Sequence, residues 1–291
     1  TIHAEQRPEP VKVGVQHHHA HVASAMAEHG FAGPVLGLAW DGTGLGTDGT
    51  AWGGELLLTT YEGFERLATL RPLRLAGGDE AIRQVWRLAL VALDDAFDGA
   101  PPLEALSLFR EVPARERSGV RQLIAQGGRA PRAHGAGRYF DAVGALGLGR
   151  HRAPYEGQVA LEWNLVAAEG EARAYPVTVE RRGAMSEIDP RPMGRGVVED
   201  LVAGVPPPVV SARFHNALAE AAAAAVAAAA ERHGPLPVVL TGGCFQNARL
   251  VADVRRRLEP AHRVGQHGVV PPGDGGLALG QALVAAAVGG A

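Results

Sequence analysis

Residues 237–247 read Pro-Val-Val-Leu-Thr-Gly-Gly-Cys-Phe-Gln-Asn, a compact apolar run that ends in a glycine pair. Valine and leucine over residues 237–240 are typical of a short buried strand, and the amphipathic pattern of residues 248–258 predicts a helix directly after the turn. The same order follows once more, with an expected strand over residues 264–270 and an expected helix over residues 277–288. Strands that alternate with helices in this way predict an α/β fold.

The preceding part of the chain adds further strands and helices. The spacing from Gln16 predicts a helix of about four turns that Gly30 closes. Apolar runs over residues 35–40 and 55–60 predict two strands joined by a glycine-rich loop over residues 41–50. Further helices are expected over residues 81–97, 118–126, 142–148 and 212–233, and residues 169–208 are interpreted as a peripheral excursion or a hinge that contains a strand over residues 175–179.

Charge and composition exclude several classes of function. The 291 residues include 28 Lys+Arg and 31 Asp+Glu, so the chain lacks the basic excess of a nucleic-acid-binding protein. Its single cysteine, Cys244, cannot form an internal disulfide and is more typical of a buried packing residue than of a nucleophile. No signal peptide pattern begins the chain, and residues 217–230 are too weakly hydrophobic to span a bilayer. We therefore expect a cytoplasmic location, with neither a nucleic acid nor a membrane as partner.

The segment His17-His-His-Ala-His21 is the densest chemical signal. On a helix, His17 and His21 lie one turn apart with about 6 Å between their Cβ atoms, which lets two imidazoles bind one cation. The same spacing occurs on an ordinary polar helix face, so both interpretations stay open. Asp41 ends an expected strand and Asp274 precedes the last helix, positions typical of cleft side chains but also of turn formers and caps. Together these four side chains would form an N2O2 set suited to iron or zinc, with magnesium a further option.

Glycine-rich turns recur at residues 41–49, 241–243 and 273–276, each at the end of an expected strand. Backbone N–H groups of such turns can cradle phosphate, and a helix that begins after the turn adds its positive dipole end. An ordinary turn explains each of them equally well, but the three together favour nucleotide binding. Asp141 and the segment Tyr155-Glu-Gly-Gln158 have the right groups to bond a ribose, and equally the right groups to cap helices.

A series of ordered segments resembles one family, the C-terminal carbamoyltransferase region of the hydrogenase maturation factor HypF. The resemblance extends from about residue 13 to the end of the chain. It rests on Val15-Gln-His-His-His-Ala-His21, Asp41-Gly-Thr-Gly-Leu-Gly46, Trp52-Gly-Gly-Glu55, Gly77-Gly-Asp79, Phe140-Asp-Ala-Val143, Tyr155-Glu-Gly-Gln158, Thr241-Gly-Gly-Cys-Phe-Gln-Asn247 and Pro271-Pro-Gly-Asp-Gly-Gly-Leu-Ala-Leu-Gly280. That region is similar to TsaD and to the O-carbamoyltransferase TobZ. The resemblance implies an α/β, TsaD-like fold of the actin-like ATPase (ASKHA) class, in which two lobes enclose a nucleotide.

The resemblance also implies roles for individual residues. His17, His21, Asp41 and Asp274 become ligands of a divalent metal, and His17, His21 and Asp41 act at the reaction centre. Contacts to the ATP- or AMP-like moiety of carbamoyl adenylate fall to Gly42, Thr43, Gly44, Asp141, Glu156, Gly157, Gln158, Gly242, Gly243 and Asn247.

The same resemblance predicts the organisation of the chain. Residues 1–12 are expected to form an irregular lead-in, residues 13–75 part of a first lobe, and residues 76–291 a helical middle and a second lobe. A complete HypF carries acylphosphatase, zinc-finger and YrdC-like domains before this region. We therefore expect those domains as partners and the chain as a fragment whose first lobe lacks its start. Exposed sheet edges and apolar surface on such a fragment would favour a homodimer.

The implied reaction is carbamoyl transfer from carbamoyl adenylate to the C-terminal cysteine thiolate of HypE, on the route to the cyanide ligand of nickel–iron hydrogenase. A bound metal would neutralise the phosphate as adenylate leaves. Two alternatives stay open: transfer to the hydroxyl of a small molecule, as in TobZ, and a nucleotide-binding scaffold that docks HypE without turnover.

Overall fold

A mixed β-sheet forms the centre of the molecule. The structure, a computed structural model, describes residues 12–127 and 130–289, so the expected lead-in lies almost wholly outside the described residues. The strand order is β6-β7-β3-β2-β1-β8-β9, and the short strands β4 and β5 attach beside β2. The strands are β1 (Val35–Leu45), β2 (Ala51–Thr59), β3 (Phe64–Leu70), β4 (Leu73–Arg74), β5 (Arg132–Ala133), β6 (Thr178–Arg182), β7 (Met185–Asp189), β8 (Val238–Thr241) and β9 (Val264–Gln266).

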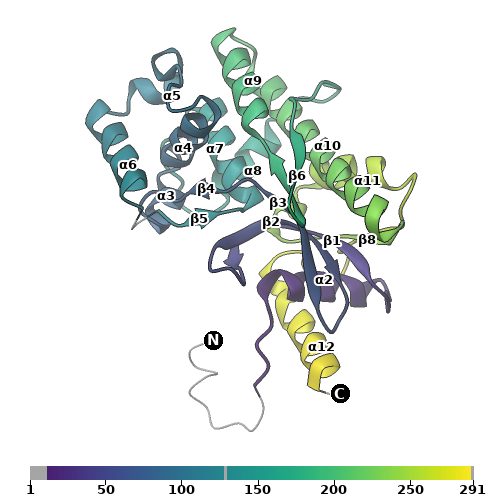
Figure 1. Cartoon of the computed structure of the whole chain (residues 1–291). Coiled ribbons are helices and arrows are strands. Elements are labelled where there is room, and N and C mark those ends of the chain that lie inside the picture. Colours follow the sequence, from purple (N-terminus) through teal and green to yellow (C-terminus); the bar gives the residue numbers. More distant parts are fainter. Residues whose placement is uncertain (1–11, 128–129, 290–291) are drawn as a thin grey trace.

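Helices cover both faces of this sheet. Two of them, α2 and α12, pack on each other below it, and the larger helical layer lies above it (Figure 1). The helices are α2 (His17–Glu28), α3 (Asp79–Arg83), α4 (Trp86–Ala96), α5 (Ser107–Arg110), α6 (Ala114–Gln126), α7 (Ala136–Leu148), α8 (Gln158–Leu165), α9 (Arg191–Val202), α10 (Pro207–His233), α11 (Ala248–Leu258) and α12 (Leu277–Gly289), with short 3-10 helices η1 (Leu103–Ala105), η2 (Gly243–Gln246) and η3 (Asp274–Gly276). The predicted α/β class is therefore confirmed.

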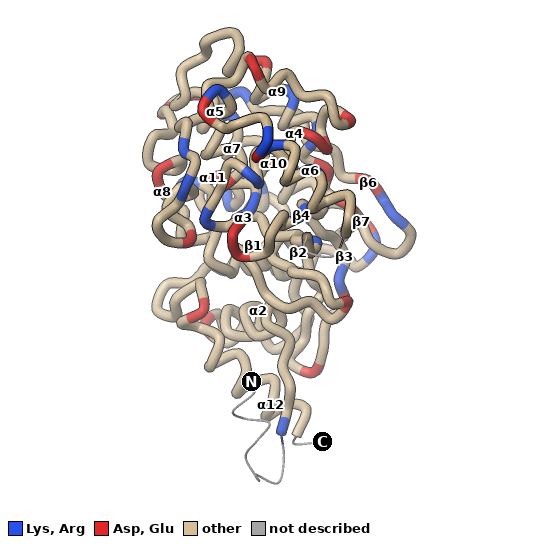
Figure 2. The backbone as a smooth tube through the Cα atoms, turned by 90° about the vertical axis from the view of Figure 1, so that its left-hand side faces the viewer, with Lys and Arg blue, Asp and Glu red and all other residues tan. Residues whose placement is uncertain are grey.

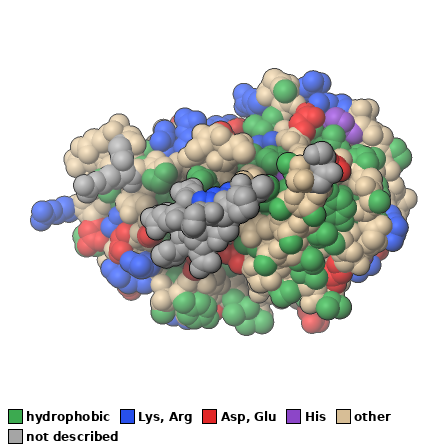
Figure 3. Space-filling model, turned by 90° about the horizontal axis from the view of Figure 1, so that it is seen from below, with side chains coloured by type: hydrophobic (Ala, Val, Ile, Leu, Met, Phe, Trp, Pro, Cys, Tyr) green, Lys and Arg blue, Asp and Glu red, His purple; other side chains and the backbone are tan. Residues whose placement is uncertain are grey.

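The two layers differ in surface chemistry. Acidic and basic residues are interspersed over the upper helical layer, whereas the layer of α2 and α12 carries few (Figure 2). Apolar side chains gather on the molecule's lower surface (Figure 3), where α12 exposes Leu279 by 40% and Val288 by 47%. Among the described residues, no helix combines the length and hydropathy that a bilayer crossing requires.

The parallel strands β1, β8 and β9 carry the part of the fold that positions the site. Leu38 of β1 pairs with Leu240 of β8, which in turn pairs with Gln266 of β9. Val238, Val239 and Leu240 are fully buried because helices lie on both faces, which explains their continuous apolar sequence. The predicted helix over residues 248–258 is α11, and Asn247 begins it by accepting a hydrogen bond from the Leu250 N–H group.

Half of the expected loop, residues 41–45, is strand. β1 continues to Leu45 and β2 begins at Ala51, so the glycines lie in a β-hairpin with an irregular register between Trp40 and Gly44. A Cβ atom on Gly44 would lie 2.6 Å from the His17 ring. Gly44 therefore allows the strand to pack closely against α2. The sequence pattern alone predicts this glycine as part of a turn.

Two other expectations need correction. The predicted helix over residues 81–97 is broken into α3 and α4, because the Trp86 N–H group points to the His151 carbonyl and the Arg83 carbonyl accepts from Ala153. Residues 169–208 form no hinge: β7 pairs in parallel with β3 and the β6–β7 hairpin extends the sheet, after which α9 packs on α4.

The strands of residues 13–75 share one sheet with later strands. β1 pairs with β8, and β3 pairs with β7. The expected division between residues 13–75 and 76–291 therefore does not coincide with a boundary in the sheet, and a division of the chain into lobes stays a prediction.

Candidate metal centre and adjoining cavity

Helix α2 brings two histidines onto one face. Gln16 caps the helix by accepting a hydrogen bond from the His19 N–H group at 2.8 Å, and Gly30, at a φ of 64°, follows its end as predicted. The Nε2 atoms of His17 and His21 lie 3.2 Å apart. His19 points away from this pair and bonds the Thr60 carbonyl, whereas the His18 ring lies beside His17 with 5.0 Å between the ring centroids.

Two carboxylates complete the cluster from distant parts of the chain. Asp41 comes from the irregular part of β1, and its Oδ2 lies 3.5 Å from His17 Nε2 and 3.2 Å from His21 Nε2. Asp274 begins η3, and its Oδ1 lies 3.6 Å from each of the same nitrogens. All four ligand atoms lie within 4.8 Å of one another.

This donor set fits a divalent metal. Ligands held 2.0–2.1 Å from a tetrahedral metal are roughly 3.4 Å apart, close to the separations seen between the histidine nitrogens and the carboxylate oxygens. Two imidazole nitrogens and two carboxylate oxygens are ligands that zinc and iron(II) accept. His21 is fully buried and the Asp41 side chain is 16% exposed, whereas the Asp274 side chain is 75% exposed, so the centre opens to solvent on the Asp274 side.

The protonation of the neighbouring groups agrees with such a centre. Burial alone would raise the pKa of Asp41, but hydrogen bonds from His17 and His21 and from the Gly42 N–H group hold it below its usual value. Burial, together with the nearby His17 and His21, lowers the pKa of His18 to about 3. Asp41 is therefore an anion, and His18 is neutral, at neutral pH.

Close backbone contacts join this cluster to helix α7. A Cβ atom on Gly135 would lie 2.0 Å from the Gly42 carbonyl oxygen, and one on Gly137 would lie 2.9 Å from the Gly42 Cα atom. Both contacts require glycine, since any side chain would separate α7 from β1. The first turn of α7 therefore lies directly beside Asp41.

A cavity of about 440 Å³ opens at this junction. Of the predicted nucleotide-binding residues, those that line it are Gly42, Asp141, Glu156, Gly157, Gly243 and Asn247, and Asp41 lies at its edge with them. The cavity is thus continuous with the candidate metal centre. Its lining also includes Phe140, Ala160 and Leu161 of α7 and α8, together with polar side chains such as Arg138 and Asn164.

Four predicted nucleotide-binding residues lie outside the cavity lining. Gly242, at a φ of 96°, packs against the Trp40 carbonyl, and Gly44 packs against the His17 ring. Thr43 is exposed further along β1. Gln158 begins α8 and bonds Glu162 within that helix.

Arg138 is a cavity residue that the sequence interpretation missed. Its side chain is 2% exposed, its Nη2 donates to Glu156 Oε1 at 2.8 Å, and its Nη1 lies 3.3 Å from Asp141 Oδ2. Its Nε and Nη1 atoms are buried and have no hydrogen-bond partner among the described residues. Burial, opposed by the Arg138 charge, raises the pKa of Asp141 to about 6. The cavity lining therefore includes a buried arginine that lies between two carboxylates.

The remaining polar residues of the cavity are held by the protein itself. Asn247 bonds the Leu250 N–H group through its side-chain oxygen, and its amide nitrogen lies 2.9 Å from His215 Nε2. Burial raises the pKa of the Cys244 thiol well above its ordinary value. Cys244 is therefore a neutral thiol, which is a poor nucleophile.

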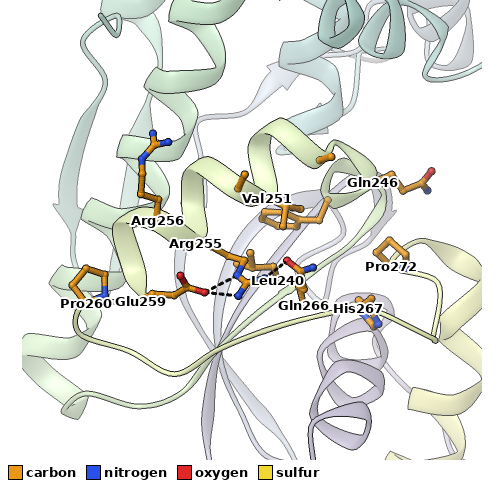
Figure 4. Close-up of a pocket in the computed structure, with 13 residues that line it drawn as sticks. Leu240, Gln246, Val251, Arg255, Arg256, Glu259, Pro260, Gln266, His267 and Pro272 are labelled. Atoms are coloured by element: carbon orange, nitrogen blue, oxygen red, sulfur yellow. Dashed lines mark hydrogen bonds and ion pairs between the residues drawn. The ribbon is translucent and has the colours of Figure 1, made fainter. Parts of the chain in front are cut away.

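A second groove, of about 710 Å³, lies between α11 and the segment after β9 (Figure 4). Arg255 is held there by Glu259 and Gln266, and Arg256 points away from the groove (Figure 4) and pairs with Asp253. The predicted site residues do not line this groove, so its chemistry differs from that of the cavity.

Comparison with known proteins follows this geometry. The family model described as "Carbamoyltransferase, Kae1-like Domain, second subdomain" matches residues 37–281, a range that crosses residue 75. Carbamoyltransferase HypF of Rhodobacter capsulatus is 46% identical over 280 residues, which are 94% of this chain and 36% of that protein. The carbamoyltransferase HypF homolog of Cupriavidus necator is 40% identical over 294 residues, 94% of this chain and 71% of that protein.

Solved structures agree with these matches. A crystal structure of full-length HypF in its phosphate- and nucleotide-bound form is similar with a TM-score of 0.92 and 35% identity, over 99% of this chain and 44% of that chain. HypF of T. kodakarensis is similar with a TM-score of 0.79 and 30% identity, over 93% of this chain and 36% of that one.

The fold and the matched domain define a Kae1-like carbamoyltransferase domain. The chain belongs to the HypF carbamoyltransferase family, and the predicted TsaD-like fold is confirmed. It spans 36% of the length of the Rhodobacter capsulatus relative.

Proposed function

We propose that this chain carries the site that transfers a carbamoyl group from carbamoyl adenylate to the C-terminal cysteine thiolate of HypE. The observation that carries the proposal is the continuity of the candidate metal centre with a cavity, because Asp41 belongs to both. A related full-length HypF, of which this chain covers 44%, is described in a phosphate- and nucleotide-bound form, which supports a nucleotide as a ligand of the family.

The chain's own residues would orient the donor in this cavity. Gly42 and Gly243 leave room for close backbone approach beside Asp41, while Arg138 would contribute positive charge near an anion. His17, His21, Asp41 and Asp274 would hold a divalent metal, with iron or zinc favoured by the donor set. Bound there, such a metal supplies positive charge that stabilises a departing phosphate.

The proposed chemistry is an acyl transfer. The thiolate sulfur attacks the carbamoyl carbon, a carbon–sulfur bond forms, and the bond from that carbon to the phosphate oxygen breaks. The electron pair leaves on AMP, so the products are a thiocarbamate and AMP. Arg138 is placed to stabilise the charge that develops on the leaving phosphate. Cys244 is half-buried and its raised pKa keeps the thiol neutral, so the attacking thiolate comes from the partner.

The donor and the partner domains belong to the proposal as well. We infer that acylphosphatase, zinc-finger and YrdC-like domains of a complete HypF supply carbamoyl adenylate to this site, and that the reaction takes place in the cytoplasm. The 36% share of the Rhodobacter capsulatus relative leaves room for such domains.

The test supplies carbamoyl adenylate and HypE to the zinc- or iron-loaded chain and follows carbamoylation of HypE by mass spectrometry. We expect HypE to gain one carbamoyl group, and Arg138→Met to reduce the rate at least tenfold while circular dichroism stays unchanged. Arg150→Met, which removes an exposed arginine two residues after the same helix, is the matched control. Transfer only to a small-molecule hydroxyl, or nucleotide binding without any transfer, would contradict the proposal.

A further inference from the structure

Glu28, at the last residue of α2, accepts an unusual number of hydrogen bonds. Its Oε1 accepts from the N–H groups of Gly268 at 2.7 Å and Val269 at 2.6 Å. Its Oε2 accepts from the Val270 N–H group at 3.3 Å and lies 3.1 Å from His267 Nδ1. The side chain is 12% exposed, so these contacts are shielded from water.

Residues 267–270, which Glu28 binds, lead directly to Asp274 in the sequence. Residues 267–270 follow β9 and lead within four residues to η3, where Asp274 faces the two histidines. At 3.6 residues per turn, position 28 lies about 20° around the helix from positions 17 and 21. One face of α2 therefore carries His17 and His21 in its first half and, at its last residue, Glu28. Glu28 in turn binds the segment that leads to Asp274.

Other contacts connect the same elements. His267 Nε2 lies 2.9 Å from the Thr241 hydroxyl, which donates to the His21 carbonyl at 3.2 Å. On the other side of Asp274, a Cβ atom on Gly280 would lie 1.8 Å from the Ala20 carbonyl oxygen. The chain on both sides of Asp274 is thus fixed to α2, upstream through Glu28 and downstream through the close contact of α12.

We propose that Glu28 is a positioning residue that holds Asp274 at the metal centre by fixing residues 267–270 to the helix that carries His17 and His21. The proposal rests on the metal centre of the proposed function. A carboxylate suits this role because four donors converge on its two oxygens, whereas a glutamine would turn its amide N–H groups toward some of them. The expected consequence of its loss is a displaced ligand and a weaker, altered metal site.

The experiment measures cobalt(II) binding by visible absorption, which reports both affinity and coordination geometry. We expect Glu28→Gln to weaken cobalt binding about 10–100-fold and to change the absorption band. Glu28→Asp keeps the charge with a shorter reach, so an intermediate loss is expected, and it carries the test if Glu28→Gln does not fold. Glu259→Gln, which removes an exposed carboxylate bonded to Arg255, is the matched control and should change neither quantity.

A double-mutant cycle separates this role from general stabilisation. If Glu28 acts through Asp274, Glu28→Gln should add little to the loss already caused by Asp274→Ala. Additive losses, or unchanged affinity and spectrum in both Glu28 variants, would overturn the inference while leaving the metal centre intact. A failure of the unmodified chain to bind cobalt would overturn the metal centre of the proposed function and the inference with it.

Discussion

Asp141, a buried carboxyl group in the cavity lining, should make the stability of the fold depend on pH. Burial raises its pKa from 3.8 to about 6 despite the neighbouring Arg138. A carboxyl group with a raised pKa in the folded state stabilises the fold most below the pKa of the unfolded chain, and that contribution is lost as pH rises through about 6. The loss amounts to about 3 kcal/mol for a shift of this size.

Asp141→Asn should therefore remove this dependence on pH. Relative to the unmodified chain, we expect the variant to gain stability as pH rises from 5 to 7.5, because the native chain must then ionise a buried acid. Urea unfolding of both proteins at the two pH values measures the difference. A constant difference between them would show that Asp141 titrates normally in the folded chain.

Cys244 gives a second prediction at this scale. Because its half-buried thiol is neutral and packs against the core, Cys244→Ser should lower the free energy of unfolding by about 1 kcal/mol, since a hydroxyl replaces a weakly polar group. Carbamoyl transfer to HypE should continue at a similar rate in the folded variant. Loss of transfer without loss of stability would place Cys244 in the chemistry.

Helix α2 can lose its two ligands without losing its packing. Its buried residues Val22, Ala25 and Met26 are fully covered and hold the helix against the sheet. The double variant His17→Ala and His21→Ala should therefore abolish metal retention in elemental analysis, while circular dichroism stays close to that of the native chain. Retained metal would disprove the ligand assignment.

The contact between α12 and α2 depends on Gly280. A methyl group there would overlap the Ala20 carbonyl, so Gly280→Ala should lower the melting temperature and weaken metal binding as η3 moves away. Gly119 of α6 has no heavy atom within 4 Å of its would-be Cβ atom, so Gly119→Ala should instead stabilise by up to about 1 kcal/mol. Calorimetry compares the two variants, and equal effects would contradict the close contact.

Elements whose signals are local could be predicted from the sequence, whereas elements defined by distant partners could not. The amphipathic pattern and the Asn247 cap specify α11 within one stretch of chain. β3 and β7 depend on each other across more than a hundred residues, so neither pattern alone indicated the sheet edge. Arg138 looks like a surface residue in sequence and is buried only because Gly42 and Gly137 let α7 approach β1.

At the scale of the whole molecule, the candidate site joins segments from both ends of the described chain. His17 and Asp274 lie at opposite ends of the sequence, yet their ligand atoms are 3.6 Å apart. The grouping of these four side chains could be predicted from the histidine spacing, the two aspartate positions and the family resemblance, and their role as metal ligands stays a prediction. The contact of Glu28 with the segment before Asp274 could not be predicted, because Glu28 belongs to no recognised motif. Its backbone partners lie after β9, far away in the sequence.

This arrangement predicts how metal binding affects the stability of the entire chain. An unfolded chain cannot hold the four ligands together, so metal binds the native state and stabilises it by about 2.7 kcal/mol at one hundred times the dissociation constant. For a chain of this size, that corresponds to a rise in melting temperature of roughly 4–5 °C. Calorimetry with added zinc should show this rise, and a chelator should reverse it. The double variant His17→Ala and His21→Ala should show none of it; an equal rise in that variant would mean that the stabilising ion binds elsewhere.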